Sequence, residues 1–376
     1  MLWAQGARAD EALTTATWSP SESSVPPASE APPDKPRDAE LDPAQRALAI
    51  AAAAGPGVVV HGLGHSAAGK PKTAQRLLAA EGVGLGLIAA SGVGLALTGA
   101  SRYVVAPLAL TGIAGFAVFG TSWLADVHGV ATDREGASKP LDAVPVVVSE
   151  AGYRYVYDPQ FRYRSFLVEG ADLRFGRLRV SPSGWFALDD DNARLRLETA
   201  WRLSGPTPHR PTPGSASFVD LEAAVTHHRY DSDGFRRATA EVSALGRWDL
   251  RNFDPALAGS FAEVGAGFAL SRVSYRIDGM QLDPELEDLL LARFGFGFWL
   301  GDPTRRGSEV RLYYDHRHDD YAAGLIVTGL ASGVAGHFGV DARTFFDERW
   351  GMRLDAQVGA AWIAGLSLLY RVGSSP

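Results

Sequence analysis

The chain has 376 residues, a formal net charge of -7 and 46% hydrophobic residues, which is enough apolar material for a large core or a membrane barrel. It contains no cysteine, so disulfide frameworks, cysteine-ligated zinc sites and thiol catalysis are excluded. Because nucleic-acid binding needs a basic surface, the mildly acidic balance also argues against nucleic acid as a partner.

Residues 1–43 are the first of four segments and are rich in Pro, Ser, Ala and acidic residues. This composition has too few apolar side chains to bury a core, so we expect a disordered tail. Ala7-Arg8-Ala9 has the small-x-small pattern that precedes a signal-peptidase site, while the charged start and apolar run of a signal peptide are missing. The segment is therefore also consistent with a signal-peptide remnant.

Residues 44–130 are predicted to be helical and to end in an apolar hairpin. Two apolar runs, 82–100 and 103–125, each have about the 20 residues that a helix needs to cross a bilayer. The first run carries small residues at four-residue spacing, which allows membrane helices to approach closely. These residues are Gly82, Gly86, Ala90 and Gly94. The alternative is a buried hairpin of a soluble domain.

The stretch His61–Lys70, HGLGHSAAGK, precedes the hairpin and combines two possible site patterns. It spells most of a phosphate-binding loop, but Pro71 stands where that loop needs a Ser or Thr for magnesium. His61 and His65 are four residues apart, and an antiparallel hairpin would bring His128 to the same level. We therefore consider a metal site at His61, His65 and His128, against the simpler interpretation of a glycine-rich loop at the membrane boundary.

Residues 131–150 are expected to be a linker, and residues 151–376 a β-domain in which hydrophobicity alternates with period two. In 237–250, for example, Ala240 and Val242 alternate with Glu241 and Ser243. About ten to twelve such strands follow one another, separated by turns rich in Gly, Asp, Asn and Pro. The pattern predicts a mainly β fold, an up-and-down antiparallel transmembrane barrel preceded by the α-helical hairpin.

The polar faces of these strands favour a barrel in lipid over a soluble one. They carry Arg and Asp or Glu in near balance and no Lys, which suits a paired network in a closed lumen. Many apolar-face positions, such as Ala240 and Ala244, are small and would pack loosely in a core. Six tryptophans near strand ends suit an aromatic girdle: Trp185, Trp201, Trp248, Trp299, Trp350 and Trp362. The alternative is a soluble ligand-binding β-barrel with its apolar faces inward.

The last strand adds to a resemblance to Gram-negative outer-membrane β-barrel proteins over about residues 151–372. In IAGLSLLY (363–370), Gly365, Leu368 and Tyr370 are similar to the C-terminal assembly signal of that family. The chain departs from the family in that RVGSSP follows the aromatic residue. The resemblance implies an outer-membrane location, contact with membrane lipids and insertion by the barrel-assembly machinery.

The helical region also resembles small two-helix membrane-hairpin modules that open with a Pro-Gly-rich run. Here the run is Gly55-Pro56-Gly57, followed by Gly62, Gly64 and Gly69. This resemblance implies no chemistry. It leaves open a contact of the hairpin with a second copy of the chain or with another envelope protein.

Charged side chains are expected to fill the lumen. The network comprises Arg194, Arg196, Arg202, Asp220, Glu222, Glu241, Arg247, Arg293, Arg311, Arg353 and Asp355. A barrel of about ten to twelve strands is narrow, so we expect a structural, assembly or narrow-channel role. The alternative is an outer-membrane hydrolase or protease with a His/Asp rim site, for example at His228 or His316. No catalytic or cofactor-binding motif stands out, and we expect no cofactor.

Overall fold

The computed structural model describes most of the chain after residue 40. The described ranges are 41–101, 103–132, 140–141, 144–158, 164–212, 215–230, 235–274, 276–277, 280–281, 285–301, 307–317, 325–326 and 334–373. The predicted tail, residues 1–43, lies outside these ranges except for its last three residues, and so does part of the predicted linker. The described residues belong to one compact unit.

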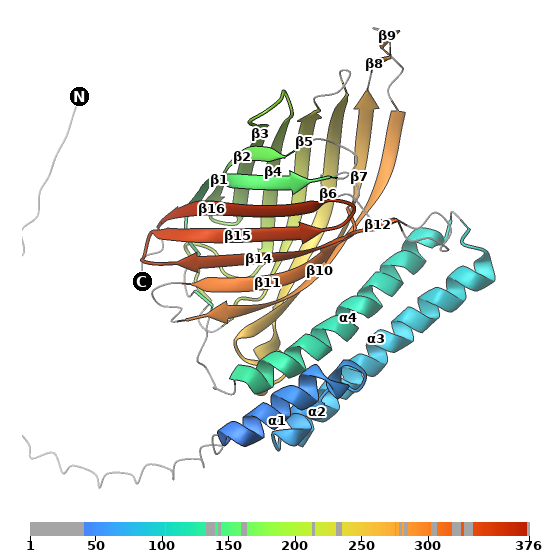
Figure 1. Cartoon of the computed structure of the whole chain (residues 1–376), viewed down its shortest axis with the longest axis vertical. Helices are drawn as coiled ribbons and strands as arrows, with labels where there is room; N and C mark the ends of the chain where they lie inside the picture. The colour runs from blue at the N-terminus through green and yellow to red at the C-terminus, as the bar shows by residue number, and fades with distance from the viewer. Residues whose placement is uncertain are drawn as a thin grey trace, which may run out of the picture. The chain divides into compact units, whose positions relative to one another are not determined.

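Within the described residues, four α-helices precede the barrel: α1 (Pro43–Ala54), α2 (Leu63–Ala67), α3 (Pro71–Thr98) and α4 (Val105–Thr132). A short 3-10 turn, η1 (Pro56–Val58), follows α1. Helices α3 and α4 form the predicted antiparallel hairpin (Figure 1), and both are long and apolar enough to cross a membrane. Gly99 ends α3 with φ +59°, a left-handed conformation that glycine adopts without strain.

The hairpin helices touch through small residues that coincide only in part with the predicted set. A Cβ on Gly84 would lie 2.9 Å from the carbonyl oxygen of Gly115, so the backbones are in close contact there. Ser91 is buried on the same face of α3, seven residues after Gly84. A Cβ on Gly82 or Gly86 would meet no described atom within 4 Å. Gly94 of the predicted set does face α4, since a Cβ there would lie 2.7 Å from Leu108 Cδ2. The four-residue spacing therefore identified the contact face only in part, because the face that meets a packed helix recurs about every 3.5 residues.

Twelve antiparallel strands close into one barrel, which confirms the predicted fold class. The strands are β1 (Val147–Tyr157), β2 (Ser165–Phe175), β3 (Leu178–Ala187), β4 (Ala193–Ser204), β5 (Phe218–Arg229), β6 (Arg236–Asp249), β7 (Ser260–Ser274), β10 (Glu285–Leu300), β11 (Ser308–Asp315), β14 (His337–Phe345), β15 (Trp350–Val358) and β16 (Trp362–Val372). Two small hairpins, β8–β9 (Arg276–Ile277, Met280–Gln281) and β12–β13 (Leu325–Ile326, Val334–Ala335), lie between barrel strands. The last strand closes the barrel on the first, with Tyr153 opposite Leu366.

The barrel wall has an apolar outside and a charged inside. On the outside, Leu221 is 48% exposed, Val225 56% and Val242 66%. Glu222 and Glu241, on the opposite face of the same strands, are each 6% exposed. A wall that shows aliphatic side chains outward and encloses ionised ones is that of a membrane barrel. The soluble-barrel alternative, which turns the apolar face inward, is therefore wrong.

Four of the six tryptophans predicted for the girdle lie on the outer surface. Trp201, Trp248, Trp350 and Trp362 are 50%, 60%, 44% and 63% exposed. Trp185 and Trp299 are 6% and 4% exposed and point into the lumen. Trp185 lies in register with the inward-facing Arg194, whose guanidinium is 5.5 Å from the indole centroid. Position near a strand end was therefore not enough to assign a face.

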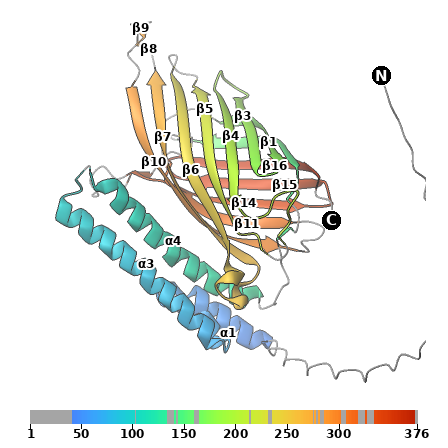
Figure 2. The same cartoon turned by 180° about the vertical axis from the view of Figure 1, so that it is seen from behind.

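The helical region packs against the outer surface of the barrel. The turns η2 (Leu250–Asn252) and η3 (Pro255–Leu257) join β6 to β7, and Leu257 is buried with Leu77 of α3, Ala125 of α4 and Phe296 of β10. Figures 1 and 2 show the hairpin beside the strands and outside the ring they form. The hairpin thus lies outside the lumen, against the chain's own barrel. A further contact with a second copy or another envelope protein stays a prediction.

Candidate functional site

The lumen is crossed by ion pairs, and several of its acidic side chains, such as Glu241 and Glu222, each bind two arginines. Glu241 on β6 accepts hydrogen bonds at 2.6 and 3.0 Å from Arg196 on β4. It also accepts bonds at 2.7 and 2.6 Å from Arg317, just after β11. Strands β7 and β10 separate β6 from β11, so Arg317 reaches its partner from a strand that is not a neighbour. Bidentate arginine–carboxylate pairs of this kind are among the strongest hydrogen bonds in proteins.

A second carboxylate, Glu222 on β5, repeats this arrangement. Arg179 from β3 donates to it at 3.0 Å, and Arg293 from β10 donates to its other oxygen. Further pairs inside the barrel are Arg202–Asp220 (2.8 Å), Arg247–Glu263 (2.7 Å), Arg311–Glu263 (2.9 Å), Arg353–Glu150 (2.8 Å) and Arg154–Asp355 (3.8 Å). The structure thus places the eleven predicted lumen residues on the inner face of the wall.

The ion pairs divide the interior into separate polar cavities. A cavity of about 490 Å³ extends to the end of the barrel at which β1 begins, since Val144 and Pro145 are in its lining. Smaller cavities of about 160 Å³ and 30 Å³ lie toward the other end, beside His337 and Arg317 respectively. Arg293 lines all three cavities. Its pair with Glu222 therefore stands where the cavities meet.

The rim histidines that were considered for an enzyme are bound to neighbouring groups. His228 Nε2 is 3.0 Å from the Asn192 side-chain oxygen, and its ring stacks on Tyr230 with centroids 3.6 Å apart. His316 Nδ1 is 2.8 Å from the Tyr314 hydroxyl. These partners are an amide, an aromatic ring and a phenol.

In the helical region, one buried carboxylate organises the stretch His61–Lys70. Asp126 of α4 is fully buried and accepts the backbone N–H groups of Gly62 (2.9 Å), Gly64 (3.1 Å) and His65 (3.0 Å). The His65 ring also contacts it, with Nδ1 2.6 Å from Asp126 Oδ1. Gly62 has φ +87°, so it can make the turn that aims these groups at the carboxylate. Four hydrogen bonds therefore fix this loop to the base of α4.

The three histidines predicted as metal ligands have separate surroundings. His61 Nδ1 is 2.7 Å from the Ser122 hydroxyl, and burial lowers the pKa of His61 from its ordinary value of 6.5 although Glu81 partly opposes the shift. His128 packs against Phe296 on the barrel, with ring centroids 6.1 Å apart. Among the residues that the structure describes, no group of three or more His, Asp or Glu side chains is placed to hold a metal ion. The stretch instead forms a tight turn at Gly62 and the short helix α2 at the base of the hairpin.

No family model and no curated protein matches the chain. The solved structures similar to it include the KdgM porin in complex with disordered oligogalacturonate, at 7% identity and a TM-score of 0.38, covering 59% of this chain and 98% of the porin. The Acinetobacter baumannii outer membrane protein Omp33 matches at 14% identity and a TM-score of 0.31, over 60% of this chain and 98% of Omp33. The β domain of the Bordetella autotransporter BrkA has 15% identity and a TM-score of 0.31, with coverage of 60% and 98%.

Because these similarities are low, the class of the protein follows from the barrel itself. Its twelve antiparallel strands close without an edge, its outer surface is apolar with exposed tryptophans, and its interior is ionised. Those features define a transmembrane β-barrel of the Gram-negative outer-membrane type. The chain is therefore an outer-membrane β-barrel protein whose outer wall contacts membrane lipids.

Proposed function

We propose that this outer-membrane barrel is a narrow channel for small ions, closed by ion pairs that cross its lumen. The observation that carries the proposal is the position of Arg293, which lines each of the three cavities described above and reaches from β10 to Glu222 on β5. If this pair separates, the cavities join into one passage. The Glu222–Arg293 pair is then the constriction of the channel.

The two partners of the constriction differ in how firmly they are held. The Glu222 side chain is 6% exposed and keeps a second partner, Arg179, at 3.0 Å. The Arg293 side chain is 35% exposed toward the cavities. Arginine is therefore the partner with room to turn aside, while Glu222 stays fixed on the wall. A partly hydrated pair is also easier to separate than a dry one, because water replaces the lost contact.

Single-channel conductance in planar bilayers tests the proposal. Arg293→Ala removes the side chain between the cavities, so we expect a conductance several-fold above that of the wild type. Arg202→Ala is the matched control, because Arg202 lines only the 490 Å³ cavity among these three and pairs with Asp220. If wild type and Arg293→Ala have equal conductance, the channel proposal is wrong and a structural role for the barrel is favoured. Lipid or peptide hydrolysis that His228→Ala abolishes would favour the enzyme alternative.

We also assign insertion of the chain to the barrel-assembly machinery. The support is the last strand, in which Leu368 is 50% exposed on the outer surface. Gly365 has an additional structural role, since a Cβ there would lie 2.7 Å from Arg154 Cγ inside the barrel. Depletion of the machinery should leave unfolded chain in the periplasm. Normal levels of folded barrel after depletion would contradict the assignment.

A further inference from the structure

A large apolar groove lies between α4 and the outer wall of the barrel. The C-terminal part of helix α4 packs on the barrel, where Ala125 of the helix and Phe296 of β10 are buried together. Beside the earlier turns of α4, from Ala109 to Leu124, the two surfaces enclose a groove of about 1360 Å³. Sites for small molecules have volumes of about 300–1,000 Å³, so this groove is larger than such a site.

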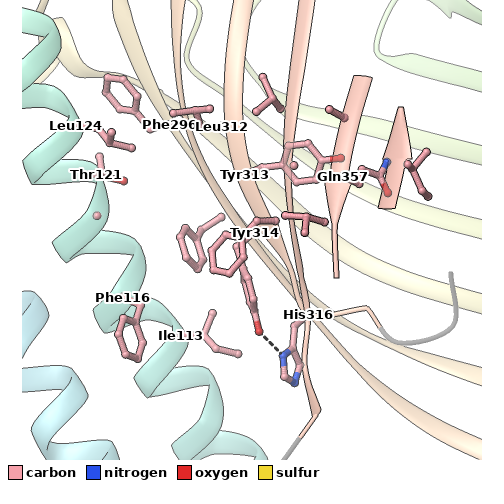
Figure 3. Close-up of a pocket in the computed structure, with 18 of the residues that line it drawn as sticks. Ile113, Phe116, Thr121, Leu124, Phe296, Leu312, Tyr313, Tyr314, His316 and Gln357 are labelled. Atoms are coloured by element: carbon pink, nitrogen blue, oxygen red, sulfur yellow. Dashed lines mark hydrogen bonds between the residues drawn. The ribbon is translucent and has the colours of Figure 1, made fainter. Parts of the chain in front are cut away.

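The groove is lined mostly by apolar side chains of α4 and of outward strand positions, and the inward-facing Tyr313 and Gln357 also reach it. Figure 3 shows Ile113 and Phe116 of α4 on one side and Phe296, Leu312 and Tyr314 of the barrel on the other. Phe296 and Leu312 are paired across β10 and β11, and they point outward because Leu312 follows Arg311, which lines the lumen. The groove is therefore continuous with the lipid-facing surface of the wall.

The groove runs at the depth of the bilayer. The helical stretch Ala109–Leu124 spans about 22 Å at a rise of about 1.5 Å per residue. That length is most of the ~30 Å hydrocarbon thickness of a membrane. On the barrel side the lining includes Tyr157 and Trp362, at the last position of β1 and the first of β16. Exposed aromatic residues at strand ends mark the level of the lipid headgroups.

We propose that this groove is a binding site for the acyl chain of a bilayer phospholipid. Water does not fill an apolar space of this kind, because it finds too few polar partners there. An unfilled space would leave the side chains on both walls without neighbouring atoms and forfeit their dispersion contacts. A hydrocarbon chain in the groove supplies these dispersion contacts to both walls. Bilayer lipid is the hydrocarbon that can enter the groove from the surrounding membrane.

One end of the groove also offers polar atoms for the glycerol or headgroup region of the lipid. The Tyr314 hydroxyl accepts the backbone N–H of Gly336 at 2.9 Å and lies 2.8 Å from His316 Nδ1 (Figure 3). Both Tyr314 and His316 line the groove. The acyl chain then extends from this end along α4 toward Leu124.

Photolabelling of the full chain tests the site. The protein is reconstituted in phosphatidylethanolamine vesicles that contain a phosphatidylcholine with a diazirine on one acyl chain, and labelled peptides are mapped by mass spectrometry. A lipid held in the groove should label the stretch with Ile113 and Phe116 several-fold more than the stretch with Leu85 and Val93. Those two residues of α3 are 47% and 58% exposed and contact only bulk lipid in this interpretation.

Two tryptophan variants give the matched controls. Ala356→Trp places a large ring in the groove from β15 and should lower labelling of the Ile113 stretch several-fold. Val242→Trp lies on the outer face of β6, which does not line the groove, and should leave the labelling unchanged. Equal labelling of α3 and α4 that is indifferent to Ala356→Trp would overturn the proposal.

A closed groove is the other outcome that would overturn it. The chain has no native cysteine, so Ile113→Cys and Val340→Cys, on opposite walls, can be combined without a background thiol. A disulfide requires Cα atoms within about 7 Å. Spontaneous, near-complete formation of this bond in vesicles would mean that α4 rests on the wall and leaves no space for a lipid. Absence of the bond together with selective labelling supports the site.

Discussion

Replacement of Glu241 by glutamine tests whether the ion pairs of the lumen stabilise the barrel. The Glu241 side chain is 5% exposed and accepts four hydrogen bonds from Arg196 and Arg317. Glutamine keeps the size of the side chain but removes the charge and turns an NH₂ group toward one arginine. Breaking a fully buried ion pair costs about 3–5 kcal/mol. Since the Arg196 and Arg317 side chains are 18% and 11% exposed, water recovers part of this cost. We therefore expect a loss of about 3 kcal/mol in the free energy of unfolding.

Urea unfolding in detergent measures this loss. With a slope of about 2–3 kcal/mol per M urea, a loss of about 3 kcal/mol lowers the unfolding midpoint by about 1 M. Ala240→Leu is the control one residue away, on the exposed outer face, and we expect it to be nearly neutral. A midpoint shift for Glu241→Gln no larger than that for Ala240→Leu would refute the reasoning. A large loss for Ala240→Leu alone would indicate an overpacked core on the face assigned to lipid.

Three further outcomes are expected. Asp126→Asn replaces the carboxylate that accepts the backbone N–H groups of Gly62, Gly64 and His65 with an amide. Hydrogen exchange of these three N–H groups should therefore become at least about tenfold faster, which corresponds to about 1.4 kcal/mol of local stability. Unchanged exchange rates would contradict the role of this carboxylate. Folding lowers the pKa of His61 from 6.5, so the unfolded chain binds more protons than the folded chain below that pH. The stability of the helical region, followed by circular dichroism, should therefore fall as the pH drops through 6.5. The fall should be smaller in His61→Gln. The closed barrel should migrate differently on a gel before and after heating and resist carbonate extraction, whereas a soluble, monodisperse 140–376 fragment without detergent would be incompatible with it.

The sequence carried enough information for the wall of the barrel, because each strand alternates with period two. The apolar and charged faces could be assigned from residues such as Ala240 and Glu241 without any knowledge of their partners. Arg317 was missed although it continues the alternation of Arg311 and Asp315 two residues beyond β11, and only the curvature of the wall brings it to Glu241. Arg179 was missed although it alternates with Leu178 and Val180, a pattern that could have identified it.

The helical region was likewise predictable from the sequence only in part. Hydrophobic length alone predicted the hairpin, since a helix needs a fixed number of apolar residues to cross a bilayer. The spacing of His61, His65 and His128 did not reveal the role of this stretch. Asp126 was visible as a carboxylate within an apolar run, but its hydrogen bonds join it to residues more than 60 positions earlier. The choice of Gly84 over Gly82 for the helix contact likewise depended on how α3 is rotated against α4.

The sequence by itself determined the apolar and charged faces of the strands, although not the faces of Trp185 and Trp299, and that an apolar helical hairpin precedes the barrel. Those features follow from local periodicity, which acts within one strand or one helix. The tertiary structure alone decided that β16 pairs with β1, that Arg293 meets Glu222 across two intervening strands, and that a groove remains between α4 and the wall. These features depend on the radius of the barrel and on the register between its strands. Both are set by how all the strands pair around the closed ring, so no single segment of the sequence specifies them.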